Sequence, residues 1–323
     1  MSGNSPSLLL DLKPFPLRVY QEEALWGKFP MIPRPNQPRL RRWALIWSRR
    51  RGKSFTLAVR SLVRMIRLRH DVYVISASRD TGEENIRKLI EVWKAVMNAA
   101  RALLKEGGGL SMIDGKTKKS VDSLDMDALE ELFESSRLQV QVKHDHTTYS
   151  RAKLLAANAN TAVGYGGDIY IDEATRILDL ARLIEAAGPI MQDQPDYELG
   201  YTTTPSIDDQ HVSFELLRPE QNDFTPSPRG NYYRSPGGIL VHRVDALDAE
   251  AAGLPFLDEE TGLPVSVWDA LARAFDQQAF MRNYLCRFLA GGSAAVSTEA
   301  LNAACLGGAN LGVANYYTGE LAV

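Results

Sequence analysis

Apolar residues along the chain fall into short uninterrupted runs and into helically spaced sets. A run at 44–46 precedes a stretch whose apolar positions recur at i, i+3, i+4, i+7, i+8 and i+11. The members of that stretch are Phe55, Ala58, Val59, Leu62, Val63 and Ile66. This spacing predicts a buried strand followed by an amphipathic helix.

The same alternation continues through most of the sequence. Residues 72–76 form a second buried-type run, and a capping box at 81–84 opens a long apolar-periodic helix that ends at the glycines 107–109. Further strands are expected at 137–142, 153–157, 168–172, 198–204 and 241–244, and further helices at 17–26, 124–135 and 265–289. Strands that alternate with helices predict a layered α/β domain with a mainly parallel sheet, in which ligands bind at the carboxyl ends of strands.

Residues 47–54 join the first predicted strand to its helix and have the composition of a phosphate-binding loop. Their sequence is Trp-Ser-Arg-Arg-Arg-Gly-Lys-Ser, so Trp47 replaces the usual first glycine. Backbone N–H groups at the helix start would bind phosphates, Lys53 would reach the β- and γ-phosphates, and the Ser54 hydroxyl would bind Mg²⁺. The alternative is a basic surface turn before a helix, and a second motif is needed to decide.

Residues 166–174 supply that second motif, because a β-prone run ends there in Asp172 and Glu173. Asp172 would orient Mg²⁺, and Glu173 would polarise the attacking water as a general base. Neighbouring side chains of an extended chain point to opposite sides, so two roles for two adjacent carboxylates are geometrically natural. The alternative is a solvated acidic turn. A basic loop and an acidic strand end in this order together indicate nucleotide hydrolysis.

Two more segments fit this hypothesis. The strand at 198–204 ends in the hydroxyls of Thr202, Thr203 and Thr204. Such a strand tip can sense the γ-phosphate and couple hydrolysis to movement, although it can also be an ordinary strand exit. In the predicted helix at 17–26, Tyr20 precedes Gln21, whose amide can bind both hydrogen-bonding edges of adenine. The alternative there is an exposed helix glutamine.

Length and composition limit the possible domain number and class of protein. The chain has 323 residues, of which 45% are hydrophobic and 24% charged, so it can form one large domain or two of ordinary size with a substantial core. The net charge of −3 argues against a surface that binds DNA everywhere, but leaves room for a local basic patch. No apolar run approaches a membrane helix or a signal peptide. The two cysteines, Cys286 and Cys305, indicate reduced intracellular thiols.

The three motifs together resemble a known family. Ser-Arg-Arg-Arg-Gly-Lys-Ser at 48–54, Ile-Tyr-Ile-Asp-Glu-Ala at 169–174 and Thr-Thr-Thr-Pro-Ser at 202–206 resemble the ATPase domain of the large terminase subunit of tailed phages, most nearly the type of Mu-like phages and prophages. The resemblance covers about residues 15–290. It implies a P-loop NTPase fold of the ASCE, or RecA-like, class: a mainly parallel sheet flanked by helices, with a small C-terminal lid or linker subdomain. A missing first glycine is normal in that family.

The resemblance also implies roles for individual residues. Arg49, three residues before Gly52, would act in cis on the γ-phosphate as an arginine finger, and Glu173 and Lys53 would complete the catalytic set. Ser54 and Asp172 would hold the metal, and Thr202, Thr203 and Thr204 would couple hydrolysis to movement. The expected nucleotide-binding set is Ser48, Arg49, Arg50, Arg51, Gly52, Lys53, Ser54, Tyr20 and Gln21.

The function implied is an ATP-hydrolysing motor that translocates double-stranded DNA into a viral procapsid in the cytoplasm of the host bacterium, using ATP and Mg²⁺ and stimulated by DNA. Its partners would be double-stranded DNA, a portal protein, a small terminase subunit and copies of itself in a ring on the portal, with no membrane. The expected division is a flexible lead (1–15), an ATPase core (16–206), a lid or linker subdomain (207–290), and a linker with the start of a nuclease domain (291–323). Because these last residues are too few for a nuclease domain, we expect no cutting activity.

Two other functions stay open. A helicase-like or other DNA-dependent P-loop ATPase would need a second RecA-like domain, and residues 207–323 show no second set of motifs. A protein of another class, a non-catalytic nucleotide-binding assembly protein, would bind ATP without turning it over. Measured hydrolysis that Glu173→Ala abolishes would eliminate the second of these.

Other candidate residues carry weaker hypotheses. Arg60, Arg64 and Arg67 lie on one face of the first predicted helix, where they could bind DNA phosphates or form an ordinary exposed polar face. The segment His144-Asp145-His146 lacks further ligands for a metal site, so a solvated strand edge is favoured. Arg151 is a further candidate, which could act in the nucleotide site of a neighbouring subunit.

Overall fold

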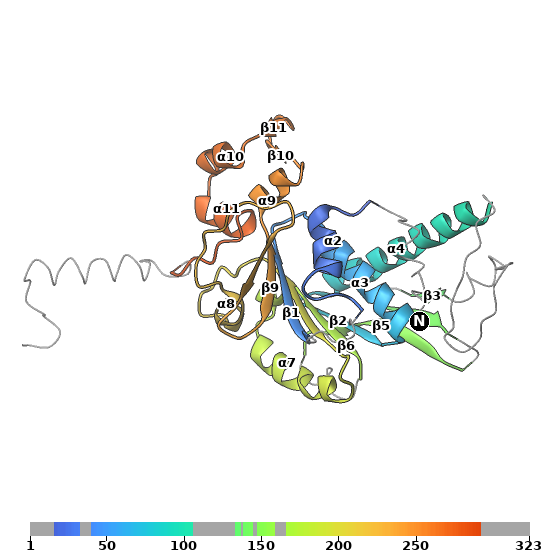
Figure 1. Ribbon diagram of the computed structural model, residues 1–323. Helices are drawn as coiled ribbons and strands as arrows, with labels where there is room; N and C mark the ends of the chain where they lie inside the picture. Colours follow the sequence, from blue (N-terminus) through green and yellow to red (C-terminus); the bar gives the residue numbers. More distant parts are fainter. Residues whose placement is uncertain are drawn as a thin grey trace, which may run out of the picture.

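The computed structural model describes residues 16–32, 40–105, 133–136, 138–144, 147–158 and 166–291. Within these ranges nine strands form one sheet, in the order β3-β4-β5-β2-β6-β7-β1-β9-β8, and two short strands pair separately (Figure 1). The expected flexible lead, the linker and the tail lie outside the described residues, as does most of the helix expected at 124–135.

The element bounds follow the chain in order. The strands are β1 (Arg42–Trp47), β2 (Val72–Ser76), β3 (Phe133–Ser135), β4 (Gln139–Lys143), β5 (Tyr149–Ala156), β6 (Asp168–Asp172), β7 (Leu199–Thr203), β8 (Asn231–Arg234), β9 (Leu240–Val244), β10 (Phe256–Leu257) and β11 (Pro264–Val265). The helices are α2 (Val19–Trp26), α3 (Lys53–Leu68), α4 (Arg79–Lys105), α7 (Leu180–Ala187), α8 (Val212–Leu217), α9 (Ala246–Ala251), α10 (Val267–Arg273) and α11 (Gln277–Asn283), with 3₁₀ turns η1 (Ala174–Arg176) and η2 (Pro189–Gln192). None of the helices in the described ranges combines the length and the apolar composition needed to span a membrane.

The centre of the sheet is parallel. Strands β5, β2, β6, β7, β1 and β9 run in one direction, whereas β4 and β3 on one edge and β8 on the other are antiparallel to their neighbours. The expected α/β class with a mainly parallel sheet is confirmed. Strand β7 lies between β6 and β1, so the strands that lead to the acidic and the basic motif are not direct neighbours.

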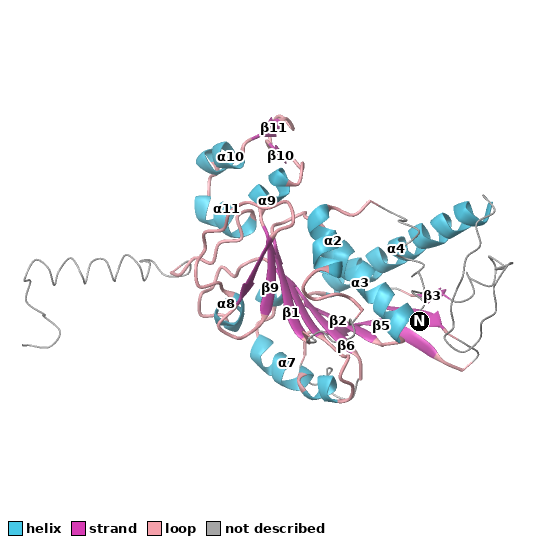
Figure 2. Ribbon diagram, in the orientation of Figure 1, coloured by secondary structure: helices cyan, strands magenta, loops and turns pink. Residues whose placement is uncertain are grey.

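Helices cover both faces of this sheet (Figure 2). Successive residues of a strand point to opposite faces, and in β1 Trp43, Leu45 and Trp47 pack in one core with residues of α2, α3 and α4. Ala44 and Ile46 point the other way and pack in a second core with residues of α7, η2 and α8. The strand is therefore buried on both sides, which explains its uninterrupted apolar run.

The structure corrects three expectations about helices and strands. Helix α4 begins at Arg79, two residues before the predicted capping box, because the Ser78 hydroxyl accepts the Thr81 N–H at 3.2 Å. The helix expected over 265–289 is two helices, since the Asp276 carboxylate accepts the Ala279 N–H at 2.8 Å and starts α11 afresh. The last residues of the helix expected over 124–135 form strand β3 instead.

The C-terminal part of the described chain has a small core of its own. Ala246, Phe256, Val267, Phe280 and Leu285 form a separate buried cluster contributed by β10 and by α9 to α11. Strands β8 and β9, although they follow position 206, belong to the main sheet. The expected lid or linker subdomain at 207–290 therefore includes two strands of the main sheet, and the division itself stays a prediction.

Gly200 in β7 provides a first test of the core. A Cβ atom at this position would lie 2.3 Å from the Trp43 ring, which is fully buried and stacks on Phe29 with ring centroids 5.4 Å apart. We expect Gly200→Ala to lower the free energy of unfolding by about 1–3 kcal/mol through overpacking, measured by urea denaturation. Gly188→Ala is the matched control, because there the nearest atom is 3.4 Å from the new Cβ. An equal effect of both substitutions would contradict the packing seen at Trp43.

Candidate functional site

The basic loop lies at the carboxyl end of β1 and leads into α3. Its backbone has positive φ at Arg50 (59°) and at Gly52 (87°), a conformation that favours glycine. A Cβ at position 52 would also lie 2.7 Å from Gln21 Nε2, so glycine is required there for two reasons. No side chain caps the N-terminus of α3, and its free N–H groups and helix dipole suit an anion.

The backbone of the loop is held by segments far away in the sequence. The Ser48 N–H donates to the Val244 carbonyl at 2.8 Å, and the Arg49 N–H donates to the Asn283 carbonyl at 3.0 Å. The side chains of Arg49 and Arg50 are exposed. The loop is thus anchored on β9 and α11, while two of its three arginines are free to face a ligand.

Lys53 points back into the loop. Its ammonium group is buried, with 9% of the residue exposed, and donates to the Trp47 carbonyl at 2.8 Å. Burial lowers the pKa of Lys53, and the negative charges of Glu173 and Asp172 act in the opposite direction. The lysine therefore lies within electrostatic reach of both candidate carboxylates, although they are far from it in the sequence.

Asp172 is the last residue of β6 and is held from two sides. The Thr202 hydroxyl on the neighbouring strand β7 donates to Asp172 Oδ1, and Asn85 Nδ2 on α4 donates to Asp172 Oδ2 at 2.6 Å. Only 1% of Asp172 is exposed. These two donors fix the plane of the carboxylate.

Glu173 does not continue the strand, so the expectation of two extended neighbours was wrong. Its φ is 52°, in the left-handed region that non-glycine residues rarely adopt and that is concentrated at functional sites. The strand ends at Asp172, and the turn, not strand alternation, separates the two carboxylates. The Glu173 side chain is 24% exposed and lies 3.7 Å from Arg176 Nε.

The hydroxyl run on β7 contacts both sides of this turn. Thr202 bonds to Asp172, whereas the Thr203 hydroxyl lies 2.8 Å from that of Thr175, accepts the Thr175 N–H at 3.3 Å and approaches the Thr204 carbonyl at 3.0 Å. Because Asp172 and Thr175 lie on either side of Glu173 in the sequence and both bond to β7, a shift of β7 would move the segment that carries this carboxylate.

Helix α2 packs against the basic loop, and the interpretation of Gln21 as an exposed glutamine was wrong. Gln21 is 5% exposed; its amide accepts the Arg18 N–H at 3.0 Å and donates to the Thr56 hydroxyl at 3.2 Å. The Tyr20 hydroxyl donates to the Arg51 carbonyl at 3.3 Å, and its ring meets Trp47 edge-on with centroids 5.2 Å apart. Burial lowers the pKa of the Arg51 guanidinium, and the charges of Tyr20, Glu250 and Asp245 act in the opposite direction.

The oxygen atoms gathered here suit Mg²⁺. Asp172 offers a carboxylate and Ser54, in the first turn of α3, a hydroxyl. Ser76 pairs with Asp172 in the sheet register, and its buried hydroxyl has no hydrogen-bond partner among the described residues. The described ranges contain no cluster of three or more His, Cys, Asp or Glu that could bind a metal by itself. Mg²⁺ commonly takes one or two carboxylates together with substrate phosphates and water.

One residue of the histidine segment, His144, is described. His144 Nε2 lies 2.8 Å from the Ser150 hydroxyl, while Asp145 and His146 lie outside the described residues. Arg151 pairs within the same chain with Asp71, at 2.9 Å.

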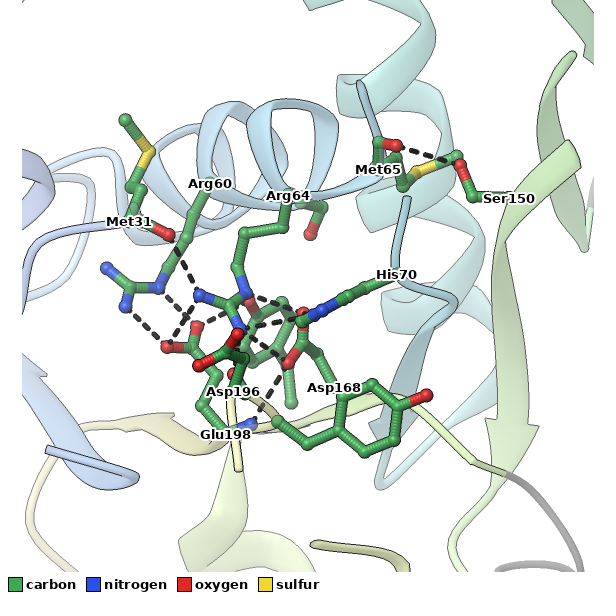
Figure 3. A network of polar contacts seen from close by, with 12 residues as sticks. Met31, Arg60, Arg64, Met65, His70, Ser150, Asp168, Asp196 and Glu198 are labelled. Carbon is green, nitrogen blue, oxygen red and sulfur yellow. Dashed lines mark hydrogen bonds and ion pairs between the residues drawn. The ribbon is translucent and has the colours of Figure 1, made fainter. Parts of the chain in front are cut away.

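Arg60 and Arg64 correct a further expectation, because neither lies on an exposed face. They are 2% and 1% exposed and point from α3 toward Glu198 and Asp168 at the amino ends of β7 and β6 (Figure 3). Arg60 binds Glu198 through two bonds of 2.5 and 2.6 Å, and Arg64 binds Asp168 through two bonds of 2.5 and 2.8 Å. Of these three arginines, only Arg67 is exposed, as expected for an ordinary polar helix face.

Further contacts complete this buried ion-pair cluster. The Tyr170 hydroxyl donates to Glu198 at 2.6 Å, and the Glu198 N–H donates to Asp168 at 3.0 Å. Burial alone would raise the pKa of Glu198, but the charges of Arg60 and Arg64 outweigh that effect and lower it to about 2. The cluster lies at the opposite ends of the strands from the basic loop, so it supports the site without taking part in it.

Sequence reasoning missed two residues of the site. Asn85 was not considered, although helices that follow parallel strands start at the carboxyl edge of the sheet, where polar residues in the first turns can meet a neighbouring strand end. Asn283 acts through its backbone carbonyl, which carries no signal in the sequence. Cys286, next to it in space, is buried, and this burial raises its thiol pKa to about 12.

Comparisons with known proteins bear on the fold. A scan against protein-family models finds no match, and neither does a search of curated proteins. Among solved structures, the large terminase ATPase domain of Thermus phage P74-26 is similar at 14% identity and a TM-score of 0.51, over 88% of this chain and 99% of that domain. The large terminase of a thermophilic bacteriophage is similar at 12% identity and a TM-score of 0.51, over 85% of this chain and 55% of its own. These likenesses show that the chain has the fold of terminase ATPase domains, as expected.

Proposed function

We propose that this chain is an ATP-hydrolysing motor of viral DNA packaging, corresponding to the ATPase domain of a large terminase subunit. One observation carries the proposal. The carboxyl ends of β1, β6 and β7 lie at a single edge of the sheet, on a fold shared with terminase ATPase domains. They carry the basic loop, the carboxylates Asp172 and Glu173, and the threonine hydroxyls of β7. Fold alone does not assign function, so the proposal rests on the residues of the site.

In this proposal each group acts on MgATP by its position. The N–H groups at the start of α3 and the Lys53 ammonium bind the phosphates, while Ser54 and Asp172 hold Mg²⁺, which neutralises charge on the phosphate oxygens. Glu173 holds the attacking water and accepts its proton. Arg49, whose backbone is pinned while its side chain is exposed, extends to the γ-phosphate.

The remaining assignments follow the same scheme. Tyr20 and Gln21 border the adenine end of the site, next to the loop that they brace. The hydroxyls of Thr202, Thr203 and Thr204 transmit the state of the phosphates to β7. Arg50, Arg51 and Gly52 shape the phosphate loop, and Ser48 orients its start.

We further propose the wider setting. The hydrolysis depends on Mg²⁺ and is stimulated by double-stranded DNA, and the motor works as a ring of copies on a portal protein, with a small terminase subunit, in the cytoplasm of the host bacterium. The Mu-like affiliation and the division into a core and a lid or linker subdomain stay predictions.

Lys53→Ala tests the proposal. Removal of the ammonium takes away the one buried cation inside the loop, so we expect ATP turnover, with and without double-stranded DNA, to fall by about 10²-fold or more. The measurement is phosphate release at saturating ATP, together with the affinity of a fluorescent ATP analogue.

Arg67→Ala is the matched control, because Arg67 lies on the exposed face of the same helix. It should leave turnover unchanged. If the unmodified protein hydrolyses ATP and Lys53→Ala does so equally well, the phosphate site is elsewhere. DNA-stimulated turnover without strand separation would favour the packaging motor over a helicase.

A further inference from the structure

Asn85 occupies an unusual place for a residue that no motif includes. It lies in the second turn of α4, and 5% of it is exposed. Its Nδ2 group donates to Asp172 Oδ2 at 2.6 Å and to the Thr81 carbonyl of its own helix at 3.2 Å. Its Oδ1 atom is buried and accepts no hydrogen bond from any described residue.

The Asp172 carboxylate is held by a second hydrogen bond, from the side opposite to Asn85. Thr202 donates to Asp172 Oδ1 and Asn85 donates to Asp172 Oδ2, so each carboxylate oxygen is held by a different element. Partners that orient a metal-binding carboxylate in this way change metal affinity when they are removed. A side-chain amide can donate this bond at any pH near neutrality, since it does not titrate.

The unpartnered Oδ1 atom of Asn85 also requires a physical explanation. A buried polar atom without a partner destabilises the fold, and a bound ligand or an ordered water can supply the missing bond. Ser76, paired with Asp172 in the register, likewise has a buried hydroxyl without a partner among the described residues. Both atoms flank Asp172, and Mg²⁺ keeps several of its waters, each a hydrogen-bond donor.

We propose that Asn85 is a positioning residue that sets the plane of the Asp172 carboxylate for the divalent cation of the bound nucleotide. The inference rests on the proposed function and deepens it. In the rival interpretation Asn85 only anchors α4. A cavity of about 10 Å³, lined by Asn85, Ser61 and Leu57 among others, could then hold one structural water for Oδ1.

The test compares the affinity for a non-hydrolysable ATP analogue with and without Mg²⁺, by fluorescence titration. Asn85→Leu keeps a similar volume but removes the donor to Asp172. We expect the gain in affinity that Mg²⁺ confers to fall by about 10–100-fold, while binding without Mg²⁺ stays as in the unmodified protein. Asn85→Ser, which is too short to reach Asp172, should give the same loss and serves if the leucine variant does not fold.

Two controls separate positioning from anchoring. Leu89→Ala, one turn further along α4 and 2% exposed, should lower the melting temperature but keep the full Mg²⁺ gain. In an Asp172→Ala background, Asn85→Leu should cause no additional loss, because the two residues act as one unit.

The outcomes are distinct. If both Asn85 variants keep the full Mg²⁺ gain, or if Asn85→Leu lowers it further without Asp172, the inference is overturned and the proposed function stands. If the unmodified protein binds no nucleotide, or binds it without any gain from Mg²⁺, the proposed site itself fails and the inference with it.

Discussion

Glu173→Gln is expected to stop ATP turnover while ATP binding persists. Glutamine has the same shape as glutamate but cannot accept the proton of the attacking water. A general base contributes about 10²–10⁴-fold to rate, so phosphate release should fall by that factor at saturating ATP. The affinity of a fluorescent ATP analogue should change little, because the phosphates are held by the loop at 48–54 and not by this carboxylate.

A glutamate on helix α7 provides a matched control for Glu173→Gln. Glu185→Gln on α7 changes an exposed carboxylate away from the site and should leave turnover as it is. Glutamine keeps the positive φ at position 173 no better and no worse than glutamate, so the melting temperature should stay constant. Unchanged turnover in Glu173→Gln, with ATP still bound, would rule out this residue as the base.

Arg64→Met should destabilise the protein strongly without any direct effect on nucleotide contacts. The substitution leaves the fully buried Asp168 carboxylate without the guanidinium that binds it through two bonds. Breaking a buried pair by removing one partner costs about 3–5 kcal/mol. Urea denaturation, followed by circular dichroism, measures the change in the free energy of unfolding.

The same helix offers a matched control. Arg67→Met, three residues away and exposed, should change stability by no more than about 0.5 kcal/mol. The double substitution Arg64→Met with Asp168→Leu should recover part of the loss, because no unpaired charge remains buried. Equal effects of the two single substitutions would show that the buried pair contributes nothing.

The ion-pair cluster also makes stability depend on pH. The pKa of Glu198 is about 2 in the folded protein and about 4.3 in an unfolded chain. A lowered folded pKa stabilises the native state above the unfolded value, and this contribution is lost as the pH falls from about 4.3 toward 2. Arg64→Met should flatten this acid dependence, since one of the two cations that lower the Glu198 pKa is gone.

The hydrophobic pattern predicted the main architecture because its causes are local. The apolar run of β1 reflects burial on both faces, and the period of α3 reflects one apolar face. The order of a basic loop and an acidic strand end placed Lys53 and Asp172 at one edge of a parallel sheet. Each of these expectations depends only on neighbouring residues and on the direction of parallel strands.

The expectations that failed depend on partners distant in the sequence. The spacing of Arg60 and Arg64 is the same whether their face meets solvent or a buried carboxylate. Their partners are Glu198, just before β7, and Asp168, the first residue of β6, and nothing in the sequence there indicates an ion pair. Similarly, the left-handed turn at Glu173 is imposed by the fold around it, because the residue type itself disfavours that conformation.

Helix α3 has one end at the phosphate loop and its middle in the buried ion-pair cluster. A helix clamped in this way to the amino ends of β6 and β7 cannot slide or tilt against the sheet without separating charges away from water. The helix and the central strands therefore form one rigid frame. The α9–α11 region is joined to this frame through the Asn283 carbonyl, which accepts the Arg49 N–H, and through Arg243 of β9, which bonds to Asp245 and to the Leu285 carbonyl.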